Sequence, residues 1–381
     1  MLAGLHRTNW LGAADAVLGR LGTRLRGQPG IPVERLAVAL YRAILGREPD
    51  SSGLDEKVRM LRAGVPLEDM IRGFLASSEF HGRVTDILVP RVALPDLTQS
   101  IPDHYETPIV RDGSMPVYVV RADADMELME SLIQRHRYYD GLGVWSPFID
   151  LDKEITAALV RGLGAHSCFE LGCYTGPVLS LLAEAGVDVL GAEVSHTAFV
   201  FAYPNIRHAM IYGDLLTIGF DRRFDVVLCM DVLEHISPLR LDAYIERLAS
   251  LVDDDGYLYL NSPMWGTDRV FGMFEEQYIE EWRRTGDSSY WRHWPCDSRG
   301  WPIHGHLVWA SPVWWERTFE SHGLVRDVAI EQAVHARLGG FFEEAIGRRC
   351  LFVLRRPGNR KSSSDVAAAV SRSLGSLPGL R

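Results

Sequence analysis

Residues 167–262 alternate between short apolar runs and amphipathic segments, and this alternation limits the possible folds more than any other feature. The runs SCFELG, VDVLGAEVS, AMIYGD, FDVVLCMD and YLYLNSP read as strands. TGPVLSLLAEAG and HTAFVFAYPNIRHA read as helices, and a third is expected to begin at Ser237 and to end at Gly256. Strands that alternate with helices predict a parallel, doubly wound sheet, which binds ligands at the carboxyl ends of its strands.

Acidic residues stand at the predicted carboxyl ends of four successive strands. They are Glu170, Glu193, Asp214 and Asp231. Each one alone is explained equally well as a solvated strand end or a helix cap. Four of them in register with one glycine turn are better explained as parts of a single ligand site.

The glycine turn follows the first of these strands, in the stretch CFELGCYTG. Gly172 and Gly176 let the chain turn and let its backbone approach a ligand closely. Their spacing differs from the GxGxxG of dinucleotide sites, and Tyr174 stands where a middle glycine could. Glu170 would repel a pyrophosphate but would stabilise a cationic ligand. S-adenosylmethionine, which carries a sulfonium and an ammonium and no phosphate, meets this demand, and an NAD-dependent oxidoreductase is disfavoured.

The acids can be matched to parts of S-adenosylmethionine. Glu170 is expected to face the positive methionine end, and Glu193 to accept hydrogen bonds from both ribose hydroxyls. Asp214 is placed to accept from the adenine amino group, with Leu215 offering a backbone N–H. Asp231 ends the fourth strand, in CMDVLEH.

Residues 165–262 resemble the class I S-adenosylmethionine-dependent methyltransferases of the small-molecule type. ELGCYTG matches the first motif, GAEVS the ribose acid, GDL the adenine acid and FDVVLCMDVLEHI the fourth-strand segment. The departures are Tyr174 for the usual glycine and Glu193 where Asp is commoner. The resemblance implies a Rossmann-like sheet of seven strands, the last near GLVRDVAI and CLFVLRRP. The residues then expected to bind the cofactor are Glu170, Gly172, Cys173, Tyr174, Gly176, Glu193, Val194, Asp214, Leu215 and Asp231.

Three histidines are candidates for the base that a hydroxyl acceptor needs. His235 directly follows the fourth strand, where capping or orienting the loop is the alternative role. His304 and His306 flank a glycine in WPIHGHLVW, and on a strand they would point to the same side. They could instead help to bind a metal with Asp297, but no dense set of carboxylates stands nearby, so no metal site is expected.

The segment 264–315 is rich in aromatic residues, with eight of the ten tryptophans between Trp265 and Trp315. Clustered aromatics suit stacking on a sugar face or a lid over a flat ligand, and their faces can attract a sulfonium. A homodimer interface is the alternative explanation.

The N-terminal part is expected to be all-helical. Residues 1–30 hold an amphipathic helix at 8–26, which either packs on a domain or second subunit or lies on a membrane surface. Residues 31–90 form a small helical domain, in which Asp50 or Ser51 caps a helix. LYRAILGREPDSSGLDEKVRMLRAGVPLEDMIRGFLASSEF resembles a bacterial domain of unknown function found in proteins linked to surface glycans, which implies a docking role for 33–83.

The remaining domain boundaries follow from composition. A connector with one strand is expected at 91–120, the methyltransferase domain at 121–357, and a disordered basic tail at 358–381, in which DVAAAVSRSL could form one short helix. Helices are expected from Met126 to Tyr139 and from Asp152 to Leu163.

Bulk composition excludes several classes of protein. The net charge of −10 argues against a nucleic-acid partner. The five scattered cysteines indicate a reducing compartment, and no apolar run approaches the length of a membrane helix. We therefore expect a cytoplasmic bacterial enzyme that methylates a hydroxyl of a sugar or glycan intermediate. The alternatives are methylation of an aromatic or lipid-like metabolite and a non-catalytic cofactor-binding scaffold.

Overall fold

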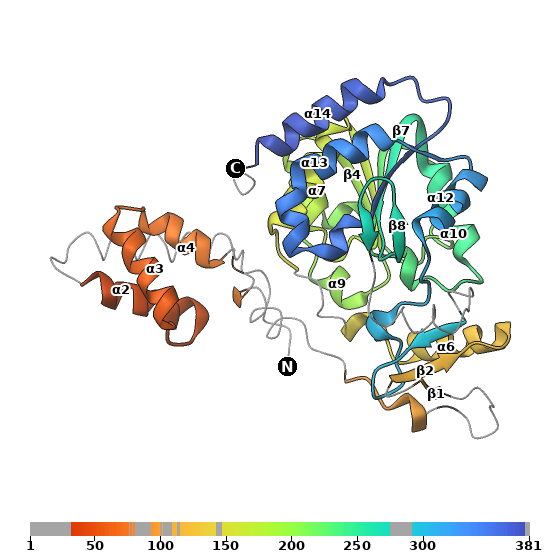
Figure 1. Cartoon of the computed structure of the whole chain (residues 1–381), viewed down its shortest axis with the longest axis horizontal. Helices are drawn as coiled ribbons and strands as arrows, with labels where there is room; N and C mark the ends of the chain where they lie inside the picture. Colours follow the sequence, from red (N-terminus) through yellow and green to blue (C-terminus); the bar gives the residue numbers. More distant parts are fainter. Residues whose placement is uncertain are drawn as a thin grey trace. The chain divides into compact units, whose positions relative to one another are not determined.

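The computed structural model (Figure 1) contains two compact units, residues 1–88 and 89–381. It describes residues 32–75, 77, 79–80, 93–99, 101, 109–112, 115–141, 147–274 and 292–377. The amphipathic helix predicted at 8–26 lies outside these residues. No described helix is both long enough and apolar enough to cross a membrane.

The first unit is helical, as predicted. Its elements are α2 (Val33–Leu40), the π-helical turn η1 (Tyr41–Leu45), α3 (Ser51–Arg62) and α4 (Leu67–Leu75). Asp50 caps α3, because its carboxylate accepts a hydrogen bond from the Gly53 amide at 2.8 Å. Tyr41 and Phe74 meet edge to face in the core of this unit.

The second unit is built on a mixed sheet of seven strands, in the order β11-β12-β7-β6-β3-β4-β5. The strands are β3 (Ser167–Leu171), β4 (Asp188–Glu193), β5 (Met210–Tyr212), β6 (Phe224–Met230), β7 (Val252–Asn261), β11 (Val325–Arg326) and β12 (Leu351–Arg355). β3 to β7 pair in parallel, and β12 is antiparallel to both β7 and β11. The predicted Rossmann-like, seven-stranded fold is confirmed.

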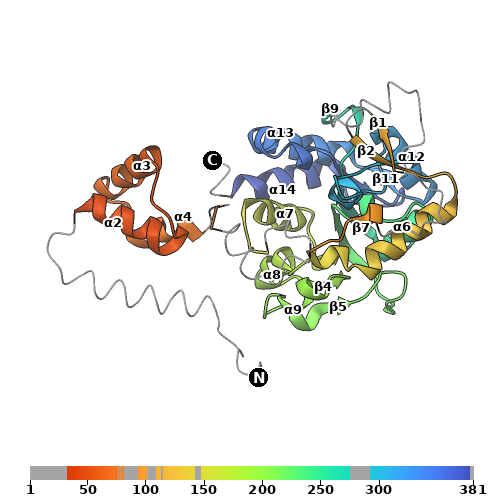
Figure 2. The ribbon, with the colours of Figure 1, turned by 90° about the horizontal axis from the view of Figure 1, so that it is seen from below.

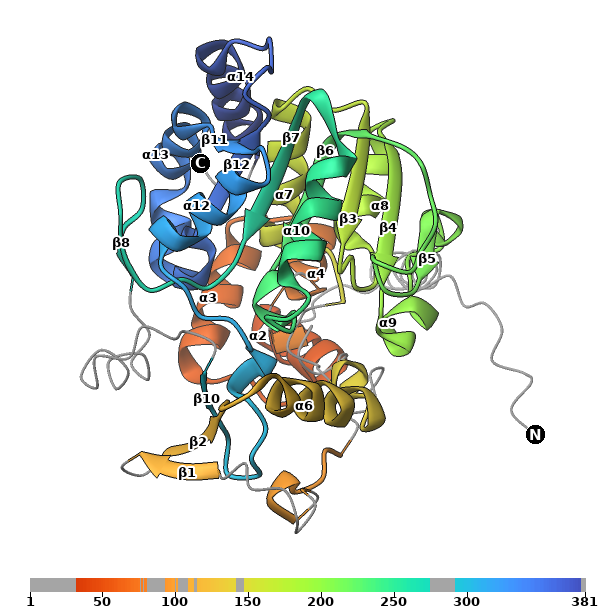
Figure 3. The same ribbon diagram turned by 90° about the vertical axis from the view of Figure 1, so that its right-hand side faces the viewer.

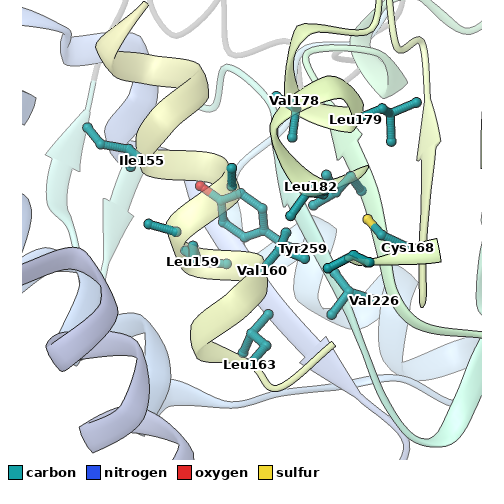
Figure 4. Packing of buried hydrophobic residues seen from close by; sticks show 14 of the residues in the cluster. Ile155, Leu159, Val160, Leu163, Cys168, Val178, Leu179, Leu182, Val226 and Tyr259 are labelled. Atoms are coloured by element: carbon teal, nitrogen blue, oxygen red, sulfur yellow. The ribbon is translucent and has the colours of Figure 1, made fainter. Parts of the chain in front are cut away.

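Helices cover both faces of this sheet (Figure 2). One face carries α7 (Leu151–Gly162), α8 (Pro177–Glu184), α13 (Val328–Glu344) and α14 (Ser363–Gly375). The other face carries α10 (Leu241–Leu251) and α12 (Pro312–Ser321), and the short α9 (His196–Val200) follows β4. Figure 4 shows Leu159 and Val160 of α7 packed towards Tyr259 and Val226 on the sheet, in one continuous apolar core.

A smaller substructure, which we call the cap, joins two segments that are distant in sequence. It contains the three-stranded sheet of β1 (Ile109–Asp112), β2 (Met115–Val119) and β10 (His293–Pro295), with α6 (Asp123–Arg135) and η3 (Tyr138–Gly141). Figure 3 shows its strands and α6 together, below the sheet in that view. Residues 109–112 and 115–119, expected within a connector, therefore form strands of the second unit.

Buried tryptophans form much of the packing between these segments. Trp294 stacks on Tyr118 with ring centroids 5.3 Å apart, and its indole N–H donates to the Leu307 carbonyl at 2.9 Å. Four tryptophans of the insert are at most 1% exposed, namely Trp294, Trp301, Trp309 and Trp315. These four build the interior, so they present no face on which a sugar could stack.

Several expected elements differ in the structure. The tail is not disordered across 363–375, because Val370 and Leu374 of α14 are fully buried in the core that α14 shares with α7 and α13. The helix expected from Ser237 to Gly256 is α10 alone, since β7 begins directly after it at Val252. In GLVRDVAI only two residues are strand, because Asp327 accepts a hydrogen bond from the Ile330 amide and caps α13.

The remaining elements are short turns and one hairpin. They are η2 (Leu97–Gln99), η4 (Arg207–Ala209), η5 (Leu233–His235), η6 (Ile303–Gly305), η7 (Ile346–Arg349) and the hairpin β8 (Gly266–Asp268) with β9 (Gly272–Phe274). Of these, η5 and η7 contribute residues to the cavity described below.

Candidate active site

A cavity of about 480 Å³ lies at the carboxyl ends of β3, β4 and β6. Residues of α6 and η3 line it from the cap, and Arg348 of η7 lines it from the far end of the chain. Nine of the ten residues predicted to bind the cofactor line this cavity: Glu170, Gly172, Cys173, Tyr174, Glu193, Val194, Asp214, Leu215 and Asp231. The tenth, Gly176, caps α8 beside it.

The glycine turn has the conformation that its sequence requires. Gly172 has a φ of +68°, and a Cβ atom there would lie 2.5 Å from Cγ2 of Val232. Gly176 has a φ of +77°, and its Cβ would lie 2.4 Å from Ile206. Tyr174 adopts a φ of 50°, a conformation that costs a non-glycine residue energy. Its amide donates to the Glu193 carboxylate at 2.7 Å, so the turn after β3 is tied to the end of β4.

Glu170 and Glu193 are buried, and no ion pair joins either of them to a described cationic side chain. Glu170 is 5% exposed, and its Oε2 has no hydrogen-bond partner in the described part of the chain. Burial raises the pKa of Glu170 to about 8, and the charge of Glu193 adds to this shift, whereas Lys153 opposes it. Burial also raises the pKa of Glu193, while hydrogen bonds from the amides of Ser195 and Tyr174 favour its charged form.

The other two acids already have cationic partners. Asp214 binds Arg240 at 2.6 Å, and Arg240 also binds Glu130 of α6 at 2.9 Å. Asp231, whose φ is 51°, forms an ion pair with Arg348. The adenine amino group expected at Asp214 would thus share this carboxylate with Arg240.

Sequence reasoning missed both arginines of these pairs. Arg240 lies 26 residues after Asp214, and Arg348 lies 117 residues after Asp231. No local spacing signals either pair. The two other cations in the lining are also paired, Arg137 with Asp140 and Lys153 with Asp150 and Asp152.

This pairing leaves an excess of negative charge at one place in the cavity. Seven carboxylate side chains and four Lys or Arg side chains line the cavity, and all four cations form ion pairs. The acids without a basic partner are Glu170 and Glu193, at the ends of β3 and β4. A cationic ligand placed between them would relieve this imbalance, whereas a phosphate would increase it.

Of the three candidate histidines, only His235 lines the cavity. Its Nδ1 lies 3.1 Å from the Gly305 carbonyl, and burial lowers its pKa to about 4. It is therefore neutral at physiological pH and able to accept a proton. Its ring centroid lies 4.9 Å from that of His306, which is 8% exposed.

His304 and His306 do not lie on a strand, which is the condition under which they would point to the same side. His304 has a φ of 57° and is exposed on the turn η6. Gly305 has a φ of +77°, and a Cβ there would lie 2.7 Å from the Tyr138 ring. Because of this turn, the His306 ring lies beside the His235 ring, whereas His304 does not line the cavity. Asp297, considered as a metal ligand only in the alternative explanation, pairs with Arg299 at 2.7 Å.

Two parts of the chain match protein-family models. Residues 148–326 match the family model of a methyltransferase domain, and residues 34–84 match a domain of unknown function, DUF4214. Magnesium-protoporphyrin O-methyltransferase of Synechocystis is 33% identical over 92 residues, which are 22% of this chain and 39% of the relative. Ubiquinone biosynthesis O-methyltransferase of Brucella ovis is 26% identical over 145 residues, 34% of this chain and 54% of the relative. The chain thus spans about half or less of these relatives' lengths.

Solved structures with a similar chain path include two methyltransferases. The amino pentose methyltransferase CalS10 of Micromonospora echinaspora is 17% identical, covers 54% of this chain and 90% of its own, and has a TM-score of 0.37. The 1,6-didemethyltoxoflavin-N1-methyltransferase of Burkholderia thailandensis is 16% identical, covers 58% and 88%, and has a TM-score of 0.37. The family match confirms the prediction that this chain carries a methyltransferase domain, and it supports S-adenosylmethionine as the cofactor.

Proposed function

We propose that the protein transfers the methyl group of S-adenosylmethionine to a hydroxyl group of a sugar or glycan intermediate. The observation that carries this proposal is the charge pattern of the cavity. Its two buried acids without a cationic partner, Glu170 and Glu193, stand at the ends of neighbouring parallel strands. S-adenosylmethionine supplies an electrophilic methyl group on a sulfonium, together with the positive charge that these acids lack.

The chain's own residues would bind and orient the reactants. Glu170 would balance the charge of the methionine end, and Glu193, fixed by two backbone amides, would accept from the ribose hydroxyls. Asp214 and Leu215 would lie at the adenine. The cap closes the cavity with Tyr138 and Tyr139, and such exclusion of water strengthens the electrostatic interactions inside.

A neutral histidine would then assist the acceptor. His235 lines the cavity and is held by the Gly305 carbonyl, so it is the best placed of the three candidate bases. His306 would act beside it, whereas His304 lies on the exposed turn. Orientation of the acceptor against the methyl group would supply much of the rate.

The attached domain and the cavity lining favour different classes of acceptor. The attached helical domain favours a sugar or glycan intermediate, since it resembles domains found in proteins linked to surface glycans. An aromatic or lipid-like metabolite is the second candidate, because apolar side chains line much of the cavity and the curated relatives carry names of O-methyltransferases. A cofactor-binding scaffold without turnover is the third.

Calorimetric titration with S-adenosylmethionine, S-adenosylhomocysteine and NAD tests the proposal. We expect micromolar binding of the first two and none of NAD. Glu193→Ala should weaken binding by about 10–150-fold, the equivalent of one charge-assisted hydrogen bond. Asp188→Ala is the matched control, because Asp188 lies at the other end of β4 and pairs with Arg222 on the surface. Binding of NAD alone, or equal affinity in both variants, would refute the site.

Turnover then separates the three functions. Loss of the methyl group from labelled S-adenosylmethionine in the presence of sugar and glycan acceptors supports the first function, methylation of a sugar or glycan intermediate. Turnover confined to phenols or lipid-like alcohols supports the second. Tight cofactor binding with no turnover across all acceptor pools would leave the scaffold.

A further inference from the structure

Three side chains able to bind a metal converge beside the cavity. Glu234 and His235 belong to η5, directly after β6, and His306 follows η6 in the insert. One ligand atom from each lies within 4.8 Å of the other two. We propose that Glu234, His235 and His306 bind a divalent transition-metal ion of the zinc class. Two imidazoles and one carboxylate form the ligand set of several catalytic zinc sites.

The burial of Glu234 is the strongest argument for a bound cation. Glu234 is 0% exposed, and neither of its carboxylate oxygens has a well-formed hydrogen bond in the described part of the chain. The hydroxyl of Ser262 lies close enough to favour its charged form, but no described basic side chain pairs with it. An unpaired buried carboxylate is costly, and a metal ion would remove that cost. A proton on Glu234 is the competing explanation.

The two imidazoles are arranged to offer lone pairs. The Gly305 carbonyl can only accept, so the proton of His235 lies on Nδ1, and Nε2 is left as the ligand atom. A backbone carbonyl that fixes the tautomer in this way is the usual partner of a metal-binding histidine. Nδ1 of His306 is buried and has no partner among the described residues.

Backbone contacts hold the two ligand segments together. The amides of Leu307 and Val308 donate to the Glu234 carbonyl at 2.6 and 3.1 Å. Ligand atoms of a tetrahedral zinc ion lie about 3.4 Å apart, given bond lengths of about 2.1 Å. The ligand atoms lie within 4.8 Å of one another, so they would need to approach by at most about 1.4 Å to reach this spacing.

A site with three protein ligands leaves a coordination position open. His235 and Leu307 line the cavity, so this position would face the acceptor. An acceptor hydroxyl bound there would become more acidic and lose its proton to water, since a bound cation stabilises the oxyanion. With the metal bound, His235 and His306 would be ligands and the cation would replace them in activating the acceptor. This role rests on the proposed function, whereas metal binding itself does not.

Metal titration of the chelator-treated full-length protein tests the inference. Co²⁺ serves as the spectroscopic probe, read by visible absorption, and Zn²⁺ is followed by calorimetry. We expect one ion per chain and at least about 100-fold weaker binding in Glu234→Gln and in His306→Ala, since even residues outside the ligand set change affinity by about 10–100-fold. His304→Ala is the matched control. His304 is exposed, its ring lies 5.5 Å from that of His306, and its loss should leave metal affinity within about threefold of the wild type.

Two outcomes would overturn the site. One is that the wild type gives neither a Co²⁺ spectrum nor a rise in Tm with Zn²⁺ that a chelator reverses. The other is that folded Glu234→Gln or His306→Ala binds Zn²⁺ as tightly as the wild type. Titration of S-adenosylmethionine into the same metal-free protein separates the two proposals. Metal binding without cofactor binding would keep the metal site and refute the proposed function.

Discussion

Replacing Glu170 by Gln should remove a pH dependence from cofactor binding. The pKa of Glu170 is about 8 in the empty protein, so only about 1% of the carboxyl is ionised at pH 6 and about half at pH 8. A cationic ligand binds the ionised form, so its affinity should rise about 50-fold between these two pH values. That factor corresponds to about 2.3 kcal/mol. Glutamine has the same shape but stays neutral, so the variant should bind weakly and lack the rise that Glu170 causes.

Calorimetric titration of S-adenosylmethionine at half-unit steps from pH 6 to pH 8 measures this difference. The two proteins should bind similarly at pH 6 and differ by about 50-fold at pH 8. S-adenosylhomocysteine, which lacks the sulfonium, shows whether Glu170 senses the sulfonium or the ammonium. Parallel curves for wild type and variant would refute the argument, because another group would then control the titration.

The same pKa makes a prediction for stability without ligand. The folded-state pKa of Glu170 lies above its ordinary value of 4.5, so the folded protein binds more protons than the unfolded chain between these limits. This contribution to stability is complete below about pH 4.5 and falls as the pH rises through 8. Thermal unfolding should therefore show Glu170→Gln to be more stable than the wild type at pH 8.5, with the gap closing towards pH 5. A constant gap would contradict the burial of the charge.

Two further substitutions test the turn and the C-terminal helix. Gly172→Ala should lower Tm more than Gly164→Ala. Both glycines have positive φ, but only at Gly172 would the new methyl group lie 2.5 Å from Val232. Equal losses of Tm would mean that this steric contact is unimportant. Leu374→Ala should lower the free energy of unfolding in urea by about 2–5 kcal/mol, because Leu374 is buried. Arg372→Ala, on the exposed side of α14, should change this free energy little. Two small effects would contradict the packing of α14.

Much of the sheet around the cavity could be predicted from the local sequence. The apolar runs identify β3 to β7, because strands buried on both faces need continuous apolar residues. The order of the motifs then places Glu170, Glu193 and Asp214 at one edge of the sheet, where the structure finds the cavity. Gly172 could also be predicted, since its positive φ is a local property of the turn.

The ends of elements were less predictable, because local pattern does not record what an element packs against. The chain from Val252 pairs with β6 as soon as α10 ends, although its acidic residues resemble a helix terminus. For the residues of α14 the local sequence allowed at most one short helix, at DVAAAVSRSL, within a disordered tail. They form a helix because Val370 and Leu374 find a buried place against α7 and α13.

The sequence by itself determined the parallel sheet, its glycine turn and the row of acids at the strand ends, since all three depend on residues that are close along the chain. Only the tertiary structure decided which acids remain without a cation, because Arg348 reaches Asp231 across 117 residues. It also brought His306 to Glu234 and His235 through a turn that Gly305 permits. These contacts depend on how the insert folds back over the sheet. Periodicity and spacing carry no signal for contacts between segments so far apart in the sequence.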